Sequence, residues 1–185
     1  MNDSDTTAKA FADKAIYKVF IAAPIETVWN ELVKTDAVLP FFFGSVCRTP
    51  GDLTTGAAMA METPNGKFRS VVGKVIEFDP PYRYSHTFKF TGYDDPPCTV
   101  TYELEAVDGG TNFSLVTTNV PKDTKTENDM ARGGTFIVNT LKSVCETGKP
   151  SFGTRFLLGL MGLATPLTPK ASRSENWSFD RIEKL

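Results

Sequence analysis

The sequence lacks the residue clusters that most metal and catalytic centres need. Its 185 residues include a single histidine, His86, and three widely separated cysteines (Cys47, Cys98 and Cys145) with no C-x-x-C pair. Zinc and transition-metal sites need several such ligands at close spacing, so we predict no metal site. Walker, G-x-G-x-x-G and G-x-S-x-G motifs are also missing. We therefore predict no catalytic residue and no cofactor.

Strong charge of one sign, a long apolar run and a signal peptide are missing as well. A net charge of -2 gives no general attraction to nucleic acid. The uncharged stretch 156–168 is too short to span a bilayer, so no stable membrane insertion is expected. Residues 1–14 are polar and have no apolar signal core. We expect them to form a flexible N-terminus of a cytoplasmic protein, whose reduced cysteines serve as small buried hydrophobes.

The sequence does contain a clear change of hydrophobic period at Pro24. Tyr17, Val19 and Ile21 occupy every second position, with Lys18 between the first two, which predicts a strand. After Pro24, which suits the first turn of a helix, apolar residues recur on one helical face. That face comprises Ile25, Val28, Trp29, Leu32 and Val33. A strand therefore runs directly into an amphipathic helix, and a second short helix or loop is expected over 35–44.

Five turn signals divide residues 46–120 into six predicted strands. They lie at 50–52, 63–66, 79–81, 92–97 and 108–110, and the Asn65-Gly66 pair suits a two-residue hairpin. Such short connections join antiparallel neighbours, so the strands should form a meander. Alternation in 82–90 and 98–106 predicts one covered face and one face in water.

Residues 126–147 are predicted to form the long helix that covers the sheet. Thr126 and Asp129 resemble a capping box, and Gly148 followed by Pro150 gives a stop signal. Gly133-Gly134 weakens the helix near its start and should leave room beneath it.

The order strand, two helices, six-strand meander and long helix resembles the helix-grip fold of START and Bet v 1-like domains. Within that superfamily, AAPIETVWNEL, GKVIEFDPPYRYSHTF, GGTNFSL and TFIVNTLKSVCETG look like the branch of activator-of-heat-shock-protein-90-ATPase homologues. The resemblance covers residues 15–148 and implies an α+β domain with an antiparallel meander wrapped around the long C-terminal helix. It also implies a cavity between sheet and helix that suits an apolar ligand. Members of the family include chaperone cofactors, carriers of small molecules or lipids, and some enzymes.

The candidate cavity residues follow from inward parity along the strands and from the helix faces. They are Trp29, Phe42, Phe43, Met59, Met61, Tyr84, His86, Phe88, Tyr102, Thr117, Asn119 and Ile137. His86 has three open interpretations: a hydrogen-bonded core histidine, a polar anchor in an apolar pocket, or a general acid–base. For Trp29 and for the phenylalanines and methionines of this set, packing in the core without ligand contact is the alternative interpretation.

Residues 149–185 form a predicted C-terminal apolar arm. Phe156, Leu157, Leu160, Met161 and Leu163 are too apolar to remain in water, so something must cover them. The cover is the protein's own body, a second copy in a homodimer, or a membrane surface. Glycine and proline favour one short helix plus extended chain.

The expected function is non-enzymatic binding or transport of a small apolar or amphipathic ligand. Two alternatives stay open at this point. One is a small cyclase-like or hydrolase-like enzyme that uses His86, and the other is a protein-binding chaperone cofactor.

Overall fold

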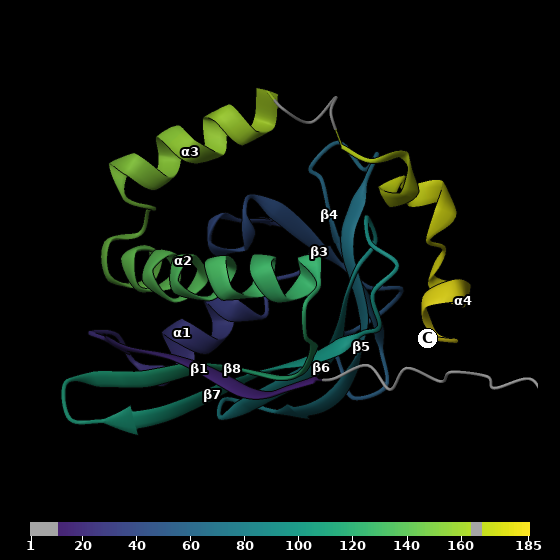
Figure 1. Cartoon of the computed structure of the whole chain (residues 1–185). Helices are drawn as coiled ribbons and strands as arrows, with labels where there is room; N and C mark the ends of the chain where they lie inside the picture. The colour runs from purple at the N-terminus through teal and green to yellow at the C-terminus, as the bar shows by residue number, and fades with distance from the viewer. Residues whose placement is uncertain (1–10, 164–167) are drawn as a thin grey trace, which may run out of the picture.

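The computed structural model describes residues 11–163 and 168–185, so 1–10 of the predicted N-terminus and 164–167 of the predicted arm lie outside it. Within the described residues, one antiparallel sheet curls around a long helix, α2 (Figure 1). The strands are β1 Phe11–Ile21, β2 Val38–Leu39, β3 Ser45–Arg48, β4 Ala58–Glu62, β5 Arg69–Asp79, β6 Arg83–Phe90, β7 Cys98–Val107 and β8 Gly110–Pro121. The helices are α1 Ile25–Leu32, η1 Pro40–Phe42, α2 Lys125–Thr147, α3 Phe152–Leu163, η3 Lys170–Ser172, η4 Ser174–Asn176 and α4 Phe179–Ile182.

The sheet confirms the predicted helix-grip meander and adds its closing pair. Its strand order is β1-β8-β7-β6-β5-β4-β3-β2, so the first strand pairs with the last. Tyr17 lies opposite Leu115 in this antiparallel pair. β1 begins at Phe11, earlier than predicted, because residues 11–14 continue the ladder with β8. The second short helix or loop expected over 35–44 consists of the two-residue strand β2 and the short 3-10 helix η1.

The hairpin between β4 and β5 differs from the prediction. Gly66 has a positive φ of 73°, but Asn65 does not, so the pair does not form the predicted two-residue turn. The loop instead spans residues 63–68 and is held by Thr63, whose backbone carbonyl accepts from the Gly66 N–H at 2.8 Å. Side-chain hydrogen bonds from Thr63 compete with the short turn and lengthen the loop.

The long helix α2 begins at Lys125, and its N-cap is Thr124 rather than the predicted Thr126. The Thr124 hydroxyl accepts from the Glu127 N–H at 3.2 Å, and the Glu127 carboxylate accepts from the Asp123 N–H at 2.8 Å. This pair resembles a capping box and lies two residues earlier than the predicted one. Thr126 instead donates its hydroxyl to Asp95 at 2.9 Å. The predicted stop is confirmed, because Gly148 caps the helix in the left-handed region.

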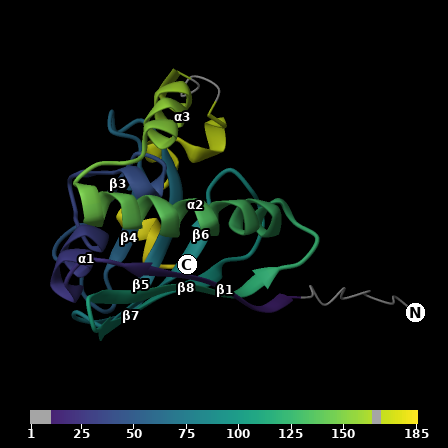
Figure 2. The ribbon, with the colours of Figure 1, turned by 90° about the vertical axis from the view of Figure 1, so that its left-hand side faces the viewer.

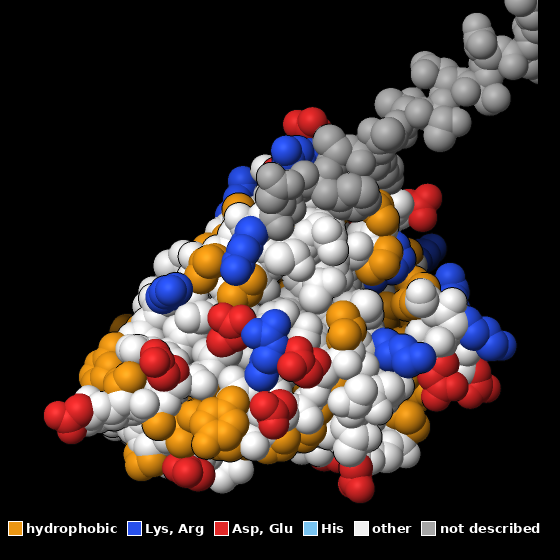
Figure 3. Space-filling view, turned by 90° about the horizontal axis from the view of Figure 1, so that it is seen from below, with side chains coloured by type: hydrophobic (Ala, Val, Ile, Leu, Met, Phe, Trp, Pro, Cys, Tyr) orange, Lys and Arg blue, Asp and Glu red, His pale blue; other side chains and the backbone are white. Residues whose placement is uncertain are grey.

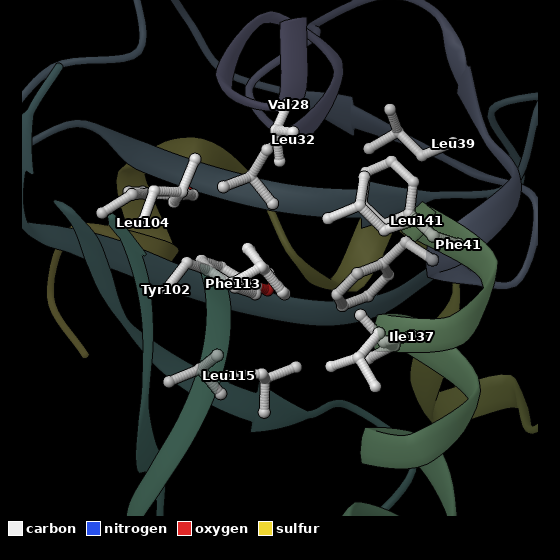
Figure 4. Packing of buried hydrophobic residues seen from close by; sticks show 14 of the residues in the cluster. Val28, Leu32, Leu39, Phe41, Tyr102, Leu104, Phe113, Leu115, Ile137 and Leu141 are labelled. Atoms are coloured by element: carbon white, nitrogen blue, oxygen red, sulfur yellow. The ribbon is translucent and has the colours of Figure 1, made fainter. Parts of the chain in front are cut away.

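The core fills one end of the space between α2 and the sheet. Phe41, Phe113 and Leu141 are each fully buried, and they come from η1, β8 and α2 (Figure 4). The predicted face of α1 is confirmed, since Ile25, Val28, Trp29 and Leu32 are buried. Pro24 is the N-cap of α1 rather than a residue of its first turn.

The outer face of the sheet is covered in part by the C-terminal residues 168–185. Trp177 and Ile182 pack in a small separate cluster with Ala58, Ala60 and Val72 of β4 and β5. This part of the predicted arm therefore docks on its own chain. Elsewhere the side opposite α2 mixes acidic, basic and scattered hydrophobic side chains (Figure 3).

Two residues on the strand faces that were expected in water are buried instead. They are Ser85 of β6 and Thr101 of β7, whose hydroxyls lie 2.9 Å apart.

The remaining part of the arm, α3, lies on the side of α2 away from the sheet (Figures 1 and 2). Its three turns form despite Gly153 and Gly159, where an added Cβ would meet open space. The prediction of one short helix thus holds for 152–163, while the chain from 170 onward adds η3, η4 and α4 instead of extended structure.

The two adjacent glycines of α2 should respond in opposite ways to alanine. A Cβ at Gly134 would lie 2.3 Å from the Tyr17 ring, whereas one at Gly133 would lie 3.7 Å from Phe43. Gly133→Ala should raise the free energy of unfolding by about 0.5–1 kcal/mol through helix propensity. Gly134→Ala should lower it by about 1–3 kcal/mol because the Tyr17 ring must move. Urea denaturation measures both changes in the free energy of unfolding. In a Tyr17→Ala background, Gly134→Ala should no longer lower this free energy. A loss that persists there would contradict the contact between Tyr17 and Gly134.

Trp177 should behave as a core residue although it lies near the C-terminus. Trp177→Ala removes the side chain that covers Ala58 and Ala60, and we expect a loss of about 3 kcal/mol in the free energy of unfolding. Leu160→Ala, on the exposed side of α3, is the control and should change it by less than about 0.5 kcal/mol. Equal effects in thermal or urea unfolding would show that the tail is not packed.

Candidate functional site

A pocket of about 720 Å³ lies between α2 and the concave face of the sheet. The sheet forms its floor with Val71, Phe88, Phe90, Val100, Tyr102, Leu115 and Thr117. The roof consists of Met130, Gly133, Gly134 and Ile137 of α2, and the sides include Phe42, Phe43, Phe68 and Leu158. Its size is within the range of sites that enclose a small molecule, and its lining is mainly apolar.

The glycines of α2 explain part of the shape of the pocket. Because Gly134 has no side chain, the Tyr17 ring of β1 packs directly against the helix backbone. Gly133 faces Phe43, which stacks on Phe136 with ring centroids 4.4 Å apart. The room predicted beneath this pair is therefore shared between the Tyr17 ring and the pocket.

One charged side chain, Asp129, is among the described residues that line the pocket. The Tyr93 hydroxyl donates to its Oδ2 at 2.6 Å, and this bond raises the pKa of Tyr93 to about 12. Lys125 lies over the Tyr93 ring, 5.5 Å from its centroid. Asp129 is half-buried near the start of α2, so one end of a mainly apolar pocket offers a carboxylate that Tyr93 holds in place.

The structure places half of the twelve candidate residues on the pocket lining. These are Phe42, Phe43, Phe88, Tyr102, Thr117 and Ile137. Five others are buried in the core beside it: Trp29, Met59, Met61, Tyr84 and His86. Trp29, for example, packs on Phe78 with ring centroids 5.2 Å apart.

Asn119 does not belong to the site, which corrects the inward parity assumed for β8. Its φ of 56° is in the left-handed region, and its side chain is exposed. The backbone thus leaves the regular alternation at this residue, and Val120 takes the next buried position.

His86 is fully buried in a ring of aromatic side chains. Its ring centroid lies 5.2 Å from that of Tyr84 and 5.8 Å from that of Tyr102. Nδ1 lies 2.8 Å from the Thr87 carbonyl oxygen, so the neutral ring donates from Nδ1. Nε2 has no hydrogen-bond partner among the residues described. Burial lowers the pKa of His86 to about 4, so the imidazole is neutral at pH 7.

This arrangement favours a core role for His86. A molecule in the pocket would contact Tyr102 and Phe88, which line it, whereas His86 does not. The thiols offer no substitute nucleophile, because burial raises the pKa of Cys47 and of Cys98 to about 12. Within residues 11–163 and 168–185, no cluster of three or more His, Cys, Asp or Glu side chains could hold a metal ion.

Several lining residues were missed in the sequence. Phe90 and Leu115 continue the inward rows of Phe88 and Thr117, so strand parity could have identified them. Leu158 and Gly159 of α3 carried no such signal, because only the tertiary structure brings α3 to the pocket. In the described part of the chain, none of the helices is long and apolar enough to cross a membrane.

Comparison with known proteins places this geometry in context. Residues 22–146 match the sequence profile of the family described as Activator of Hsp90 ATPase homolog 1-like protein. Among curated proteins, none matches the chain in sequence.

Solved structures share the fold at low sequence identity. A protein from Chromobacterium violaceum is 22% identical with a TM-score of 0.56, over 72% of this chain and 97% of that one. The Aha1 dimer from Colwellia psychrerythraea is 16% identical with a TM-score of 0.60, over 75% and 99%. An HSP90 activator from Plasmodium falciparum is 21% identical with a TM-score of 0.55, over 72% and 94%. At these identities the likeness shows the fold alone.

The buried state of His86 predicts a specific pH dependence of stability. Its pKa is about 4 when folded and near 6.5 when unfolded, so the unfolded chain binds more protons between these values. Stability should therefore fall as the pH drops from about 6.5 to 4, by up to about 3 kcal/mol from this residue.

A variant with a similar side-chain volume tests this assignment. His86→Leu has no imidazole to protonate, so it should not lose the stability that His86 loses between about pH 6.5 and 4. The free energy of unfolding of the variant relative to wild type should therefore rise as the pH falls. Urea unfolding of both proteins at several pH values between 4 and 7.5 measures the difference. Parallel pH profiles would contradict a neutral buried histidine.

Proposed function

This chain belongs to the Activator of Hsp90 ATPase homolog 1-like family, and on that premise we propose that it binds and carries a small apolar or amphipathic molecule without catalysing a reaction. The pocket of about 720 Å³ is the observation that supports this most directly. A volume of this size with an apolar lining and few polar groups is typical of small-molecule sites. Filling it with such a ligand removes apolar surface from water, which supplies the binding free energy.

The polar groups at one end define the class of ligand. Asp129 accepts a hydrogen bond from Tyr93 through Oδ2, which leaves Oδ1 to accept from a ligand hydroxyl or ammonium group. A ligand carboxylate would be repelled by the same side chain. We therefore expect an apolar body that carries a hydroxyl or cationic group, rather than a free fatty acid.

A carrier fits the site better than an enzyme that uses His86. The histidine is buried behind the pocket lining and is neutral, and its Nδ1–H is occupied by the Thr87 carbonyl. General acid–base catalysis needs a side chain within hydrogen-bond reach of the reacting group. The three free cysteines also fit a protein of the reducing cytoplasm, where we propose that it acts.

A second candidate function is that of a chaperone cofactor. The similar structure from Plasmodium falciparum is named an HSP90 activator, and that from Colwellia psychrerythraea is an Aha1 dimer. The test is the ATPase rate of a purified Hsp90 chaperone with and without this protein. Stimulation would favour the cofactor function, and sedimentation of the protein alone would report a homodimer.

Enlarging side chains on the two walls of the pocket should abolish ligand binding. Val100 lies on the floor and Ile137 on the roof, so Val100→Trp with Ile137→Trp reduces the space between them. We expect at least about a tenfold loss of affinity for the uncharged fluorescent probe N-phenylnaphthylamine, because its ring system no longer fits. Titration of probe fluorescence measures this, and native mass spectrometry of the purified protein identifies any natural ligand.

The matched control places tryptophan outside the pocket. Ile16 and Ile76 are 46% and 49% exposed, on β1 and β5, and do not line the pocket. Ile16→Trp with Ile76→Trp should leave the probe affinity within about twofold of wild type, and melting curves show that each variant is folded. If the pocket variant is folded and still binds the probe as wild type does, the carrier function fails.

A further inference from the structure

The helix α3 presents its apolar side to solvent instead of to the protein. Phe152, Phe156 and Leu160, spaced at i, i+4 and i+8, form one ridge and are 84%, 65% and 50% exposed. The opposite side, with Thr154 and Leu158, is half-buried against the body. A surface helix of a globular protein normally has the reverse orientation, so this ridge faces something other than the chain's own core.

The chain on both sides of α3 is held to the body. Before it, the Ser143 and Thr147 hydroxyls donate to the Lys149 carbonyl at 3.1 and 3.0 Å. After it, the Thr91 hydroxyl donates to the Ser172 hydroxyl at 2.9 Å, and that of Ser174 donates to the Gly66 carbonyl at 2.7 Å. The outward ridge is therefore carried by a helix that spans two anchored points.

This helix is also a wall of the pocket. Leu158, on the side opposite the exposed ridge, contributes to the lining, and so does its neighbour Gly159. Figures 1 and 2 show α3 beyond α2, on the side away from the sheet. Whatever the ridge contacts would consequently lie next to the pocket.

The charge around α3 favours an anionic surface. Residues 149–174 include four basic side chains and no acidic one, whereas the rest of the chain has sixteen basic and twenty-two acidic residues. Lys149, Arg155 and Lys170 are exposed beside or within the helix. Basic residues next to exposed Phe and Leu are the composition of helices that lie in the interface of an anionic bilayer.

The exposed area of the ridge is small for a stable protein interface. With Leu157, which lies outside the ridge and is 42% exposed, the described part of α3 exposes four large apolar side chains. Their complete burial would cover roughly half of the ~800 Å² per partner in a standard interface. Reversible attachment to an anionic membrane needs less apolar area, because the attraction of basic side chains to the lipid phosphates adds to it.

We propose that α3 docks on an anionic membrane, with Phe152, Phe156 and Leu160 in the boundary between headgroups and acyl chains. Lys149, Arg155 and Lys170 then contact the lipid phosphates. Leu158 and Gly159 keep the pocket directly behind this surface, so its ligand exchanges with the bilayer. The exchange step rests on the proposed carrier function, but the docking step does not.

Co-sedimentation of the full chain with lipid vesicles tests the docking. The protein should bind vesicles that contain phosphatidylglycerol at least about tenfold more strongly than vesicles of phosphatidylcholine alone, and high salt should weaken the binding. Phe156→Ser with Leu160→Ser should reduce it by about tenfold or more. The control Ile16→Ser with Ile76→Ser changes two similarly exposed side chains on β1 and β5 and should leave it unchanged.

Three results would overturn the proposal. They are no binding to either vesicle, binding that the α3 variant retains, and self-association in sedimentation that the α3 variant abolishes, which would make the ridge a dimer contact. The N-phenylnaphthylamine titration separates the two proposals. Probe binding without vesicle binding refutes docking alone, and vesicle binding without probe binding refutes the carrier function alone.

Discussion

The packing of the C-terminal half of α2 against α1, η1 and the sheet is the contact on which the rest of the structure depends. Leu141 of α2 is fully buried in the same cluster as Phe41 and Phe113, and Ile137, Val138 and Val144 are also buried. This anchored half fixes where the helix crosses the sheet. The other half, from the N-cap to Gly134, therefore remains over the sheet without filling the space below, and the pocket results.

The apolar residues of the chain are divided among three environments. The inside of the curled sheet is solid core at one end and pocket at the other. Its outside is covered locally by the tail, where Arg69 reinforces the packing through an ion pair of 2.9 Å with Glu62 and a position 4.4 Å above the Phe179 ring. The ridge of α3 faces solvent. Since α3 joins the core helix to the docked tail, the pocket wall and the exposed surface belong to one element.

The buried histidine illustrates how the pocket keeps an apolar lining. Tyr84, His86 and Tyr102 share the inward face of the sheet, yet only Tyr102 reaches the pocket surface. Desolvation keeps the His86 ring uncharged, which avoids an unpaired charge inside the aromatic cluster. Among the described lining residues, the one charged side chain is Asp129, which the Tyr93 hydroxyl holds at one end of the pocket. The amphipathic ligand that we propose matches this distribution.

Most elements and their buried faces follow from the residues alone, because hydrophobic period and turn chemistry are local properties. The meander, the apolar face of α1 and the stop at Gly148 could be predicted in this way, and so could six of the residues that line the pocket. A predicted buried position, however, shows only that the side chain leaves water and does not identify the residues that it contacts. Long-range packing is what places Trp29 and His86 in solid core, whereas Phe42 and Ile137 face the pocket. Contacts between residues far apart in the chain also decide three other features, which no local pattern encodes. These are the left-handed backbone at Asn119, the pairing of β1 with β8, and the division of the arm into a docked tail and an outward-facing α3.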